Sequence, residues 1–195
     1  MTQLSPFKTL PSIIALACIC FSAGCSSAKK TTEKNSTVTA NKQGELSYAI
    51  HKSNVPARKI DTKNISADKL VQFAETLIGT RYKYGSSNKD EGFDCSGFIN
   101  YVFNHFDIKV PRSSIDFTNA GTAVLPGESR KGDLILFTGS DTTGWIVGHM
   151  GIITRNDKGK IKFIHSASGN NMGVMISDMS NYFITRFVKV IRIFK

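Results

Sequence analysis

A cysteine stands at the point where a helix is expected to begin. Asp94, just before it, is a favourable N-cap residue, because its side-chain oxygen can accept from the free N–H groups of the first turn. The apolar residues that follow recur at helical spacing and define one buried face, formed by Phe98, Ile99, Val102, Phe103 and Phe106. Cys95 would lie in the first turn, where the positive end of the helix dipole favours thiolate over thiol. We therefore expect Cys95 to be a nucleophile.

Two histidines are expected to face each other on neighbouring strands. Segments 148–154 and 161–167 have the pattern of strands, and residues 155–159 have the composition of a hairpin loop. If Thr154 pairs with Lys160, then His149 stands directly opposite His165 on one face of the sheet. One imidazole could take the thiol proton and later protonate a leaving amine, while the other orients the first. This pattern predicts a triad of Cys95, His149 and His165.

Two other interpretations fit the same three side chains. Zinc accepts thiolate and imidazole ligands and can keep an open fourth position, so a metal site is one alternative. An inert buried cysteine beside two ordinary sheet histidines is the other. Two histidines in register beside a helix-start cysteine favour nucleophilic catalysis, and we expect neither a metal nor a cofactor.

The first 24 residues have the pattern of a secretory signal peptide. Lys8 is followed by an apolar run at 13–21 and then by small residues before Cys25. The ending Ser22, Ala23, Gly24, Cys25 resembles a bacterial lipobox, although Leu is usual where Ser22 stands. We expect cleavage after residue 24 and acylation of Cys25. A plain signal peptide and an uncleaved anchor are the alternatives.

Counting the cysteines supports a reactive thiol. Cleavage would remove Cys18 and Cys20, and acylation would occupy Cys25. Cys95 would then have no disulfide partner, although an exported protein is in a compartment that favours disulfides.

The rest of the chain divides into a polar segment and one domain. Residues 25–65 are rich in Ser, Thr, Lys and Asn, which predicts a disordered tether. We expect the domain at 66–195, with a first helix capped by Ser66 and ended by Gly79. Five strand segments follow the helices, at 133–137, 148–154, 161–167, 174–176 and 187–194. Helices first and antiparallel strands afterwards indicate an α+β fold.

Six motifs then occur in the order seen in NlpC/p60 cysteine peptidases, which this chain resembles over about 66–195. They are TyrLysTyrGly at 82–85, PheAspCysSerGlyPhe at 93–98, ValProArgSerSer at 110–114, LysGlyAspLeuIleLeuPhe at 131–137, GlyHisMetGlyIle at 148–152 and PheIleHisSerAla at 163–167. The resemblance implies a papain-like fold, with N-terminal helices packed on an antiparallel sheet of about five to six strands. It also implies cleavage of cell-wall peptides, commonly between D-Glu and meso-diaminopimelate.

The resemblance assigns roles to the three chemical side chains. Cys95 resembles the nucleophile, His149 the general base and His165 the orienting third residue. Tyr82 resembles a tyrosine whose hydroxyl helps to hold the oxyanion, with an ordinary loop aromatic as the alternative.

It also suggests residues that contact the substrate. Asp94 and Ser96 would contact the amino end of the peptide, unless Asp94 is simply a cap, and Ser114 would lie near the cleft, unless it serves a turn. Phe117 stands where relatives often have Gln. Residues 139–145 form a longer segment than usual, which could place Trp145 at the substrate groove or over the sheet edge.

We expect a lipid-anchored hydrolase of peptidoglycan stem peptides, monomeric and held at the outer membrane facing the periplasm. The net charge of +10 suits anionic partners, but the basic residues are spread along the chain rather than clustered, and we expect no nucleic-acid partner. The alternative to an enzyme is a non-catalytic wall-binding or scaffold lipoprotein. An acyltransferase or amidase of related fold would share the chemistry and differ in its acceptor.

Overall fold

The computed structural model describes residues 39–40, 46–47, 59–169 and 172–195. The expected signal peptide, Cys25 and most of the expected tether lie outside the described residues. Within the N-terminal part, β1 (Thr39–Ala40) pairs antiparallel with β2 (Leu46–Ser47). In the part of the chain that the structure describes, no helix has the length and apolar character needed to cross a membrane.

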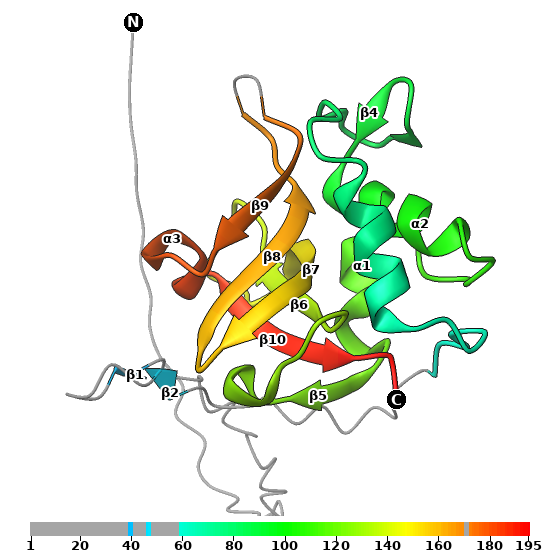
Figure 1. The fold of residues 1–195 in the computed structure, drawn as a ribbon. Helices are drawn as coiled ribbons and strands as arrows, with labels where there is room; N and C mark the ends of the chain where they lie inside the picture. The colour runs from blue at the N-terminus through cyan, green and yellow to red at the C-terminus, as the bar shows by residue number, and fades with distance from the viewer. Residues whose placement is uncertain (1–38, 41–45, 48–58, 170–171) are drawn as a thin grey trace, which may run out of the picture. The chain divides into compact units, whose positions relative to one another are not determined.

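A six-stranded antiparallel sheet is the centre of the domain (Figure 1). Its strands, in spatial order, are β5 (Thr122–Val124), β10 (Phe187–Arg192), β6 (Leu134–Thr138), β7 (Val147–Asp157), β8 (Lys160–Ser166) and β9 (Val174–Asp178). The expected α+β architecture with a sheet of five to six strands is confirmed.

The helices that precede the sheet begin at capped residues. The Ser66 hydroxyl accepts from the Lys69 N–H at the start of α1 (Ala67–Glu75). The Asp94 carboxylate caps α2 (Cys95–Asn104), so Cys95 is the first residue of that helix, as expected. The remaining short elements are β3 (Ser87–Asn88), β4 (Gly92–Phe93), the 3-10 helices η1 (Ser114–Asn119) and η2 (Pro126–Glu128), and α3 (Asn181–Ile184).

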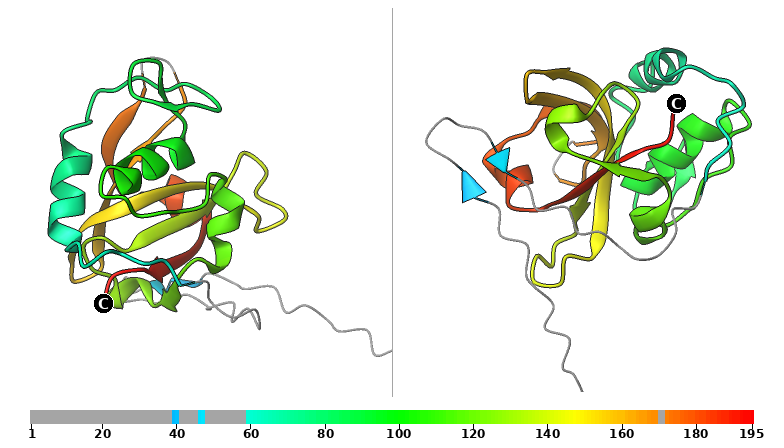
Figure 2. Two further views of the ribbon diagram at one scale, coloured as in Figure 1. Left: turned by 90° about the vertical axis from the view of Figure 1, so that its right-hand side faces the viewer. Right: turned by 90° about the horizontal axis from the view of Figure 1, so that it is seen from below.

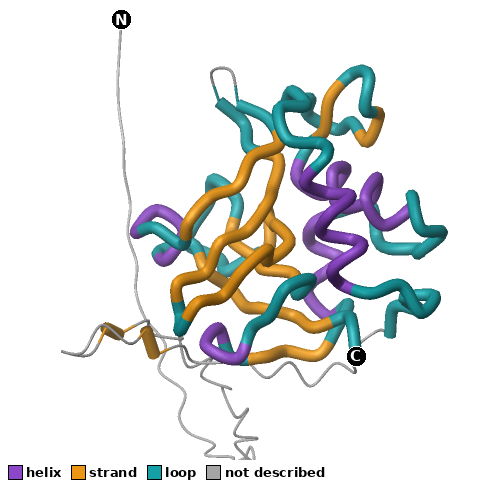
Figure 3. The backbone as a smooth tube through the Cα atoms, viewed as in Figure 1, coloured by secondary structure: helices purple, strands orange, loops and turns teal. Residues whose placement is uncertain are grey.

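Apolar side chains fill both faces of the sheet. Leu134 and Leu136 of β6 face the cluster that also contains the buried sides of α1 and α2. Ile135 and Phe137 alternate with them and face a second cluster, against which Phe183 of α3 packs. Figures 1 and 2 show α1 and α2 on one side of the sheet and α3 on the other, and in Figure 3 the purple tubes of α1 and α2 lie together, apart from that of α3.

The packed chain starts earlier than Ser66, the expected boundary. Ile60 is buried in the first cluster, and Ile65 packs against it. Residues 59–65 therefore belong to the domain and not to the tether, because these two isoleucines are covered by the core.

We expect Gly97→Ala to destabilise the domain although Ala is the better helix former. A Cβ at Gly97 would lie 2.0 Å from the carbonyl oxygen of Ser86, which is backbone and cannot rotate away. The first turn of α2 would have to move, and overpacking of this kind lowers the free energy of unfolding by about 1–3 kcal/mol. Urea denaturation measures the change.

Gly127→Ala is the matched control, because nothing lies within 4 Å of a Cβ built there. We expect it to change the free energy of unfolding by less than about 0.5 kcal/mol. Equal stability of the two variants would contradict the close approach of Ser86 to α2.

Candidate active site

The Cys95 thiol lies against the strand that carries His149. Its Sγ is 3.8 Å from the carbonyl oxygen of Gly148, and the backbone N–H of Met150 also interacts with the sulfur. The thiol therefore contacts the peptide groups on both sides of His149. Cys95 is a free cysteine and is partly exposed, so a substrate can reach it.

The structure brings the two expected histidines together. Nε2 of His149 and Nδ1 of His165 are 2.9 Å apart, which is hydrogen-bond distance. Nε2 of His165 is in turn 2.9 Å from the Ser177 hydroxyl. A chain of hydrogen bonds thus leads from His149 through His165 to β9. Because His165 occupies Nε2 of His149, Nδ1 is the ring nitrogen that remains free to take a proton; among the described residues it forms no hydrogen bond with the Cys95 thiol.

The expected register between the two strands is wrong by two residues. Ile152 pairs with Ile164, so Gly151 is the residue opposite His165 and His149 lies diagonally from it. The hairpin turn is only Lys158 and Gly159, both with positive φ, and the strands are longer than expected. A β-bulge at Thr154 shifts the pairing by one further residue on the side of the turn, where Arg155 pairs with Lys162.

Both histidines nevertheless share a face, because a shift of two residues preserves the alternation of side chains. Gly151 also leaves space between them. A Cβ there would lie 2.7 Å from the Phe163 ring and 3.2 Å from Cβ of His165.

Aromatic rings enclose the histidine pair on the side of the sheet opposite α1 and α2. The ring centroid of Phe183 lies 5.5 Å from that of His165 and 6.4 Å from that of His149. The Phe163 ring is tilted by 44° relative to the His165 ring at a centroid distance of 4.9 Å, and the Phe137 ring lies 6.0 Å from that of His149. His165 is only 1% exposed. The sequence offered no signal for Phe183, because it reaches the site from α3.

Burial keeps the thiol and both imidazoles uncharged at neutral pH. It raises the pKa of Cys95 to about 11, and the charge of Asp94 adds to the rise, although the N–H groups of Ser96, Cys95 and Met150 oppose it. The expectation of an acidic thiol is therefore wrong for the free protein, because desolvation outweighs the helix end. Burial lowers the pKa of His149 to about 4, and burial with the nearby His149 lowers that of His165 to about 3.

Asp94 and Ser96 form an ion-pair network with Arg112. The Arg112 guanidinium donates to both carboxylate oxygens of Asp94, at 3.1 and 2.8 Å, and to the Ser96 hydroxyl at 3.0 Å. The Gly97 N–H donates to the same carboxylate at 2.6 Å. Burial alone would raise the pKa of Asp94, but the hydrogen bonds from Arg112 and Gly97 outweigh it and hold the pKa below its usual range.

This network changes the expected role of Asp94. Its carboxylate is a helix cap and an ion-pair partner, and both oxygens already accept hydrogen bonds, so a peptide amino group would have to compete with Arg112. Arg112 itself lies in the motif at 110–114, but its partner is set by tertiary structure.

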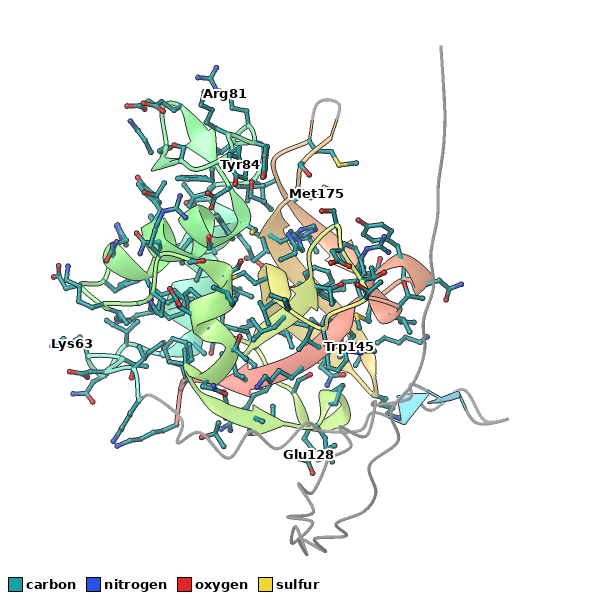
Figure 4. All side chains as sticks on the ribbon, turned by 180° about the vertical axis from the view of Figure 1, so that it is seen from behind. Lys63, Arg81, Tyr84, Glu128, Trp145 and Met175 are labelled. Atoms are coloured by element: carbon teal, nitrogen blue, oxygen red, sulfur yellow. The ribbon has the colours of Figure 1, made fainter. Side chains whose placement is uncertain are left out.

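The remaining expected site residues separate into two groups. Tyr82 lies near the thiol: burial, followed by the charges of Cys95 and Asp94, raises the pKa of its hydroxyl. Ser114 begins η1 and forms no hydrogen bond with Cys95 or the histidines among the described residues. Phe117 is fully buried in the first core cluster and does not line a cleft. Figure 4 shows Trp145, half-exposed, on the loop that leads into β7.

The burial of the histidine pair predicts that acid destabilises the domain. The unfolded imidazoles bind protons near pH 6.5, whereas the folded ones remain neutral down to about pH 4 and 3. The unfolded state binds more protons in this window, so the free energy of unfolding falls as the pH is lowered from 6.5 to 5. The loss is limited to roughly 2 kcal/mol per ring at pH 5. Urea denaturation at several pH values measures it.

The double variant His149→Gln, His165→Gln should flatten this pH dependence. The control is His105→Gln, since the side chain of His105 is exposed. An unchanged slope in the double variant would show that the two rings do not stay neutral in the folded state.

Comparison with known proteins places this site in a family. The model of the NlpC/P60 family matches residues 79–192, which include all three triad candidates. The chain is 33% identical over 135 residues to "Gamma-DL-glutamyl hydrolase" of Bacillus subtilis (strain 168), covering 69% of this chain and 32% of that protein. It is 35% identical over 124 residues to "Murein DD-endopeptidase MepS/Murein LD-carboxypeptidase" of Escherichia coli (strain K12), covering 63% of this chain and 58% of that protein.

A solved structure of an NLP/P60 family protein described as similar to lipoprotein, from Staphylococcus aureus subsp. aureus Mu50, has the same fold. Its TM-score is 0.56 at 24% identity, over 73% of this chain and 45% of that one. The chain thus spans about a third of the length of the glutamyl hydrolase and somewhat over half of the length of the murein endopeptidase. The resemblance based on the six motifs is confirmed, and this chain belongs to the NlpC/P60 family.

Proposed function

We propose that this protein is a cell-wall hydrolase that cleaves peptidoglycan stem peptides through a thioester on Cys95. The observation that carries the proposal is the placement of the thiol against the backbone that flanks His149, whose imidazole is hydrogen-bonded to His165. The relatives named above, a glutamyl hydrolase and a murein endopeptidase, support this substrate class.

The uncharged resting state determines how the reaction would start. Nδ1 of His149 takes the thiol proton as the sulfur attacks the carbonyl carbon of the scissile amide. The new positive charge on His149 is stabilised because its Nε2–H donates to Nδ1 of His165. His149 then gives the proton to the leaving amine, and the C–N bond breaks. Water, activated by the same imidazole, hydrolyses the thioester and restores the thiol.

We assign the oxyanion of the tetrahedral intermediate to two donors. The Cys95 backbone N–H is at the start of α2 and already interacts with its own sulfur, so it faces the reacting atom. The Tyr82 hydroxyl is the second candidate, since its pKa responds to the charge of Cys95. Both act where negative charge develops.

The bond that is cut and the location of the enzyme are the finer parts of the proposal. We favour the bond between D-Glu and meso-diaminopimelate. Stem peptides carry free carboxylates, and the net charge of +10 of this chain suits such an anionic substrate. The lipobox-like ending at Cys25 supports a lipid anchor in the outer membrane, facing the periplasm. We propose that the enzyme acts there as a monomer.

Digestion of purified muropeptides tests this proposal. We expect mass spectrometry to show stem-peptide fragments that match cleavage after D-Glu, formed by the wild type. Cys95→Ala should lower the rate by at least about a thousandfold, because the nucleophile is removed.

His149→Ala should lower the rate to a similar extent, whereas Ser180→Ala, a change at an exposed residue that makes no side-chain cap for α3, should not alter it. Muropeptide binding without cleavage, unchanged in Cys95→Ala, would support a non-catalytic wall-binding protein instead. Fragments of another mass would show that a different bond is cut, and the protein would still be a cell-wall hydrolase.

A further inference from the structure

We infer that Ser177 is a positioning residue that fixes the tautomer of His165. The inference rests on the proposed function, because it concerns the base that would activate Cys95. Ser177 is the end of the hydrogen-bond chain that starts at His149, with its hydroxyl oxygen 2.9 Å from Nε2 of His165.

The topology of the sheet brings Ser177 to this position. β9 is the outermost strand beside β8, and Ser177 pairs with Phe163, two residues before His165. Ser177 and His165 therefore share one face and are diagonal neighbours, within side-chain reach. No other side-chain hydrogen bond of Ser177 occurs among the described residues.

Proton counting shows why an acceptor is needed there. When His149 has taken the thiol proton, both of its ring nitrogens are donors. Its Nε2–H then needs an acceptor, so Nδ1 of His165 must be unprotonated and the single proton of that neutral ring must be on Nε2. In that tautomer the Nε2–H of His165 donates to the Ser177 hydroxyl oxygen, 2.9 Å away.

Among the described residues, Nε2 of His165 has no hydrogen-bond partner other than the Ser177 hydroxyl. The ring is 1% exposed and lies against Phe163 and Phe183. In Ser177→Ala the Nε2–H would be a buried donor without a partner, which disfavours the working tautomer. The proton would move to Nδ1 of His165, where it opposes the donor on a charged His149. The base would then be weakened at the moment it takes the proton.

Nitrogen-15 NMR of histidine-labelled protein measures the tautomer without any substrate. In the wild type we expect the His165 shifts of a ring protonated at Nε2. Ser177→Ala should move them toward those of the Nδ1-protonated form, and Ser177→Thr, which keeps a hydroxyl on a strand, should restore them. Ser180→Ala is the control, because the Ser180 side chain is exposed and does not cap α3.

Muropeptide cleavage measures the consequence. We expect Ser177→Ala to lower kcat about tenfold to a hundredfold with little change in KM, and Ser177→Thr to recover most of it. Wild-type His165 shifts in Ser177→Ala, or a Thr variant that behaves like the Ala variant, would overturn the inference. If the wild type cleaves no muropeptide but the shifts change as expected, the proposed substrate fails and the role of Ser177 stands.

Discussion

The close approach of the first turn of α2 to the backbone around Ser86 is the constraint on which the site depends. The Asp94 N–H donates to the Ser86 carbonyl at 3.0 Å, and Gly97 has no side chain that would displace the same carbonyl. The Asp94 carboxylate then caps the helix and binds Arg112. With its N-terminus fixed in this way, α2 holds Cys95 against β7.

The electrostatics of the site follow from burial more than from the helix dipole. The thiol, with a pKa of about 11, and the imidazoles, with values of about 4 and 3, are all neutral in the resting protein. A preformed imidazolium would be poorly solvated among Phe137, Phe163 and Phe183. In the reaction we propose, charge separation is therefore tied to the arrival of the substrate, when the developing oxyanion meets its donors and the proton is passed on.

Much of the site could be predicted from sequence because it depends on local patterns. The Asp94 cap and the apolar stripe placed Cys95 at a helix start, and strand alternation placed His149 and His165 on one face even though the register was wrong by two residues. The pKa of the thiol could not be predicted, since it depends on how deeply α2 is packed. Nor could Arg112 be assigned, because its partner is 18 residues away in sequence.

The contribution of the C-terminal third shows where sequence patterns give no guidance. Ser177 is one polar residue in a short edge strand, and Phe183 is in a helix of four residues; neither has a motif. They meet at His165 only because β9 pairs with β8 and the chain then turns back across the sheet into α3 and β10. One supplies a hydroxyl within hydrogen-bond distance of the ring, and the other packs its own ring against the same imidazole. The histidine pair is thus contacted and buried by residues that follow it in the chain, while the thiol that we propose as its nucleophile comes from a helix that precedes it.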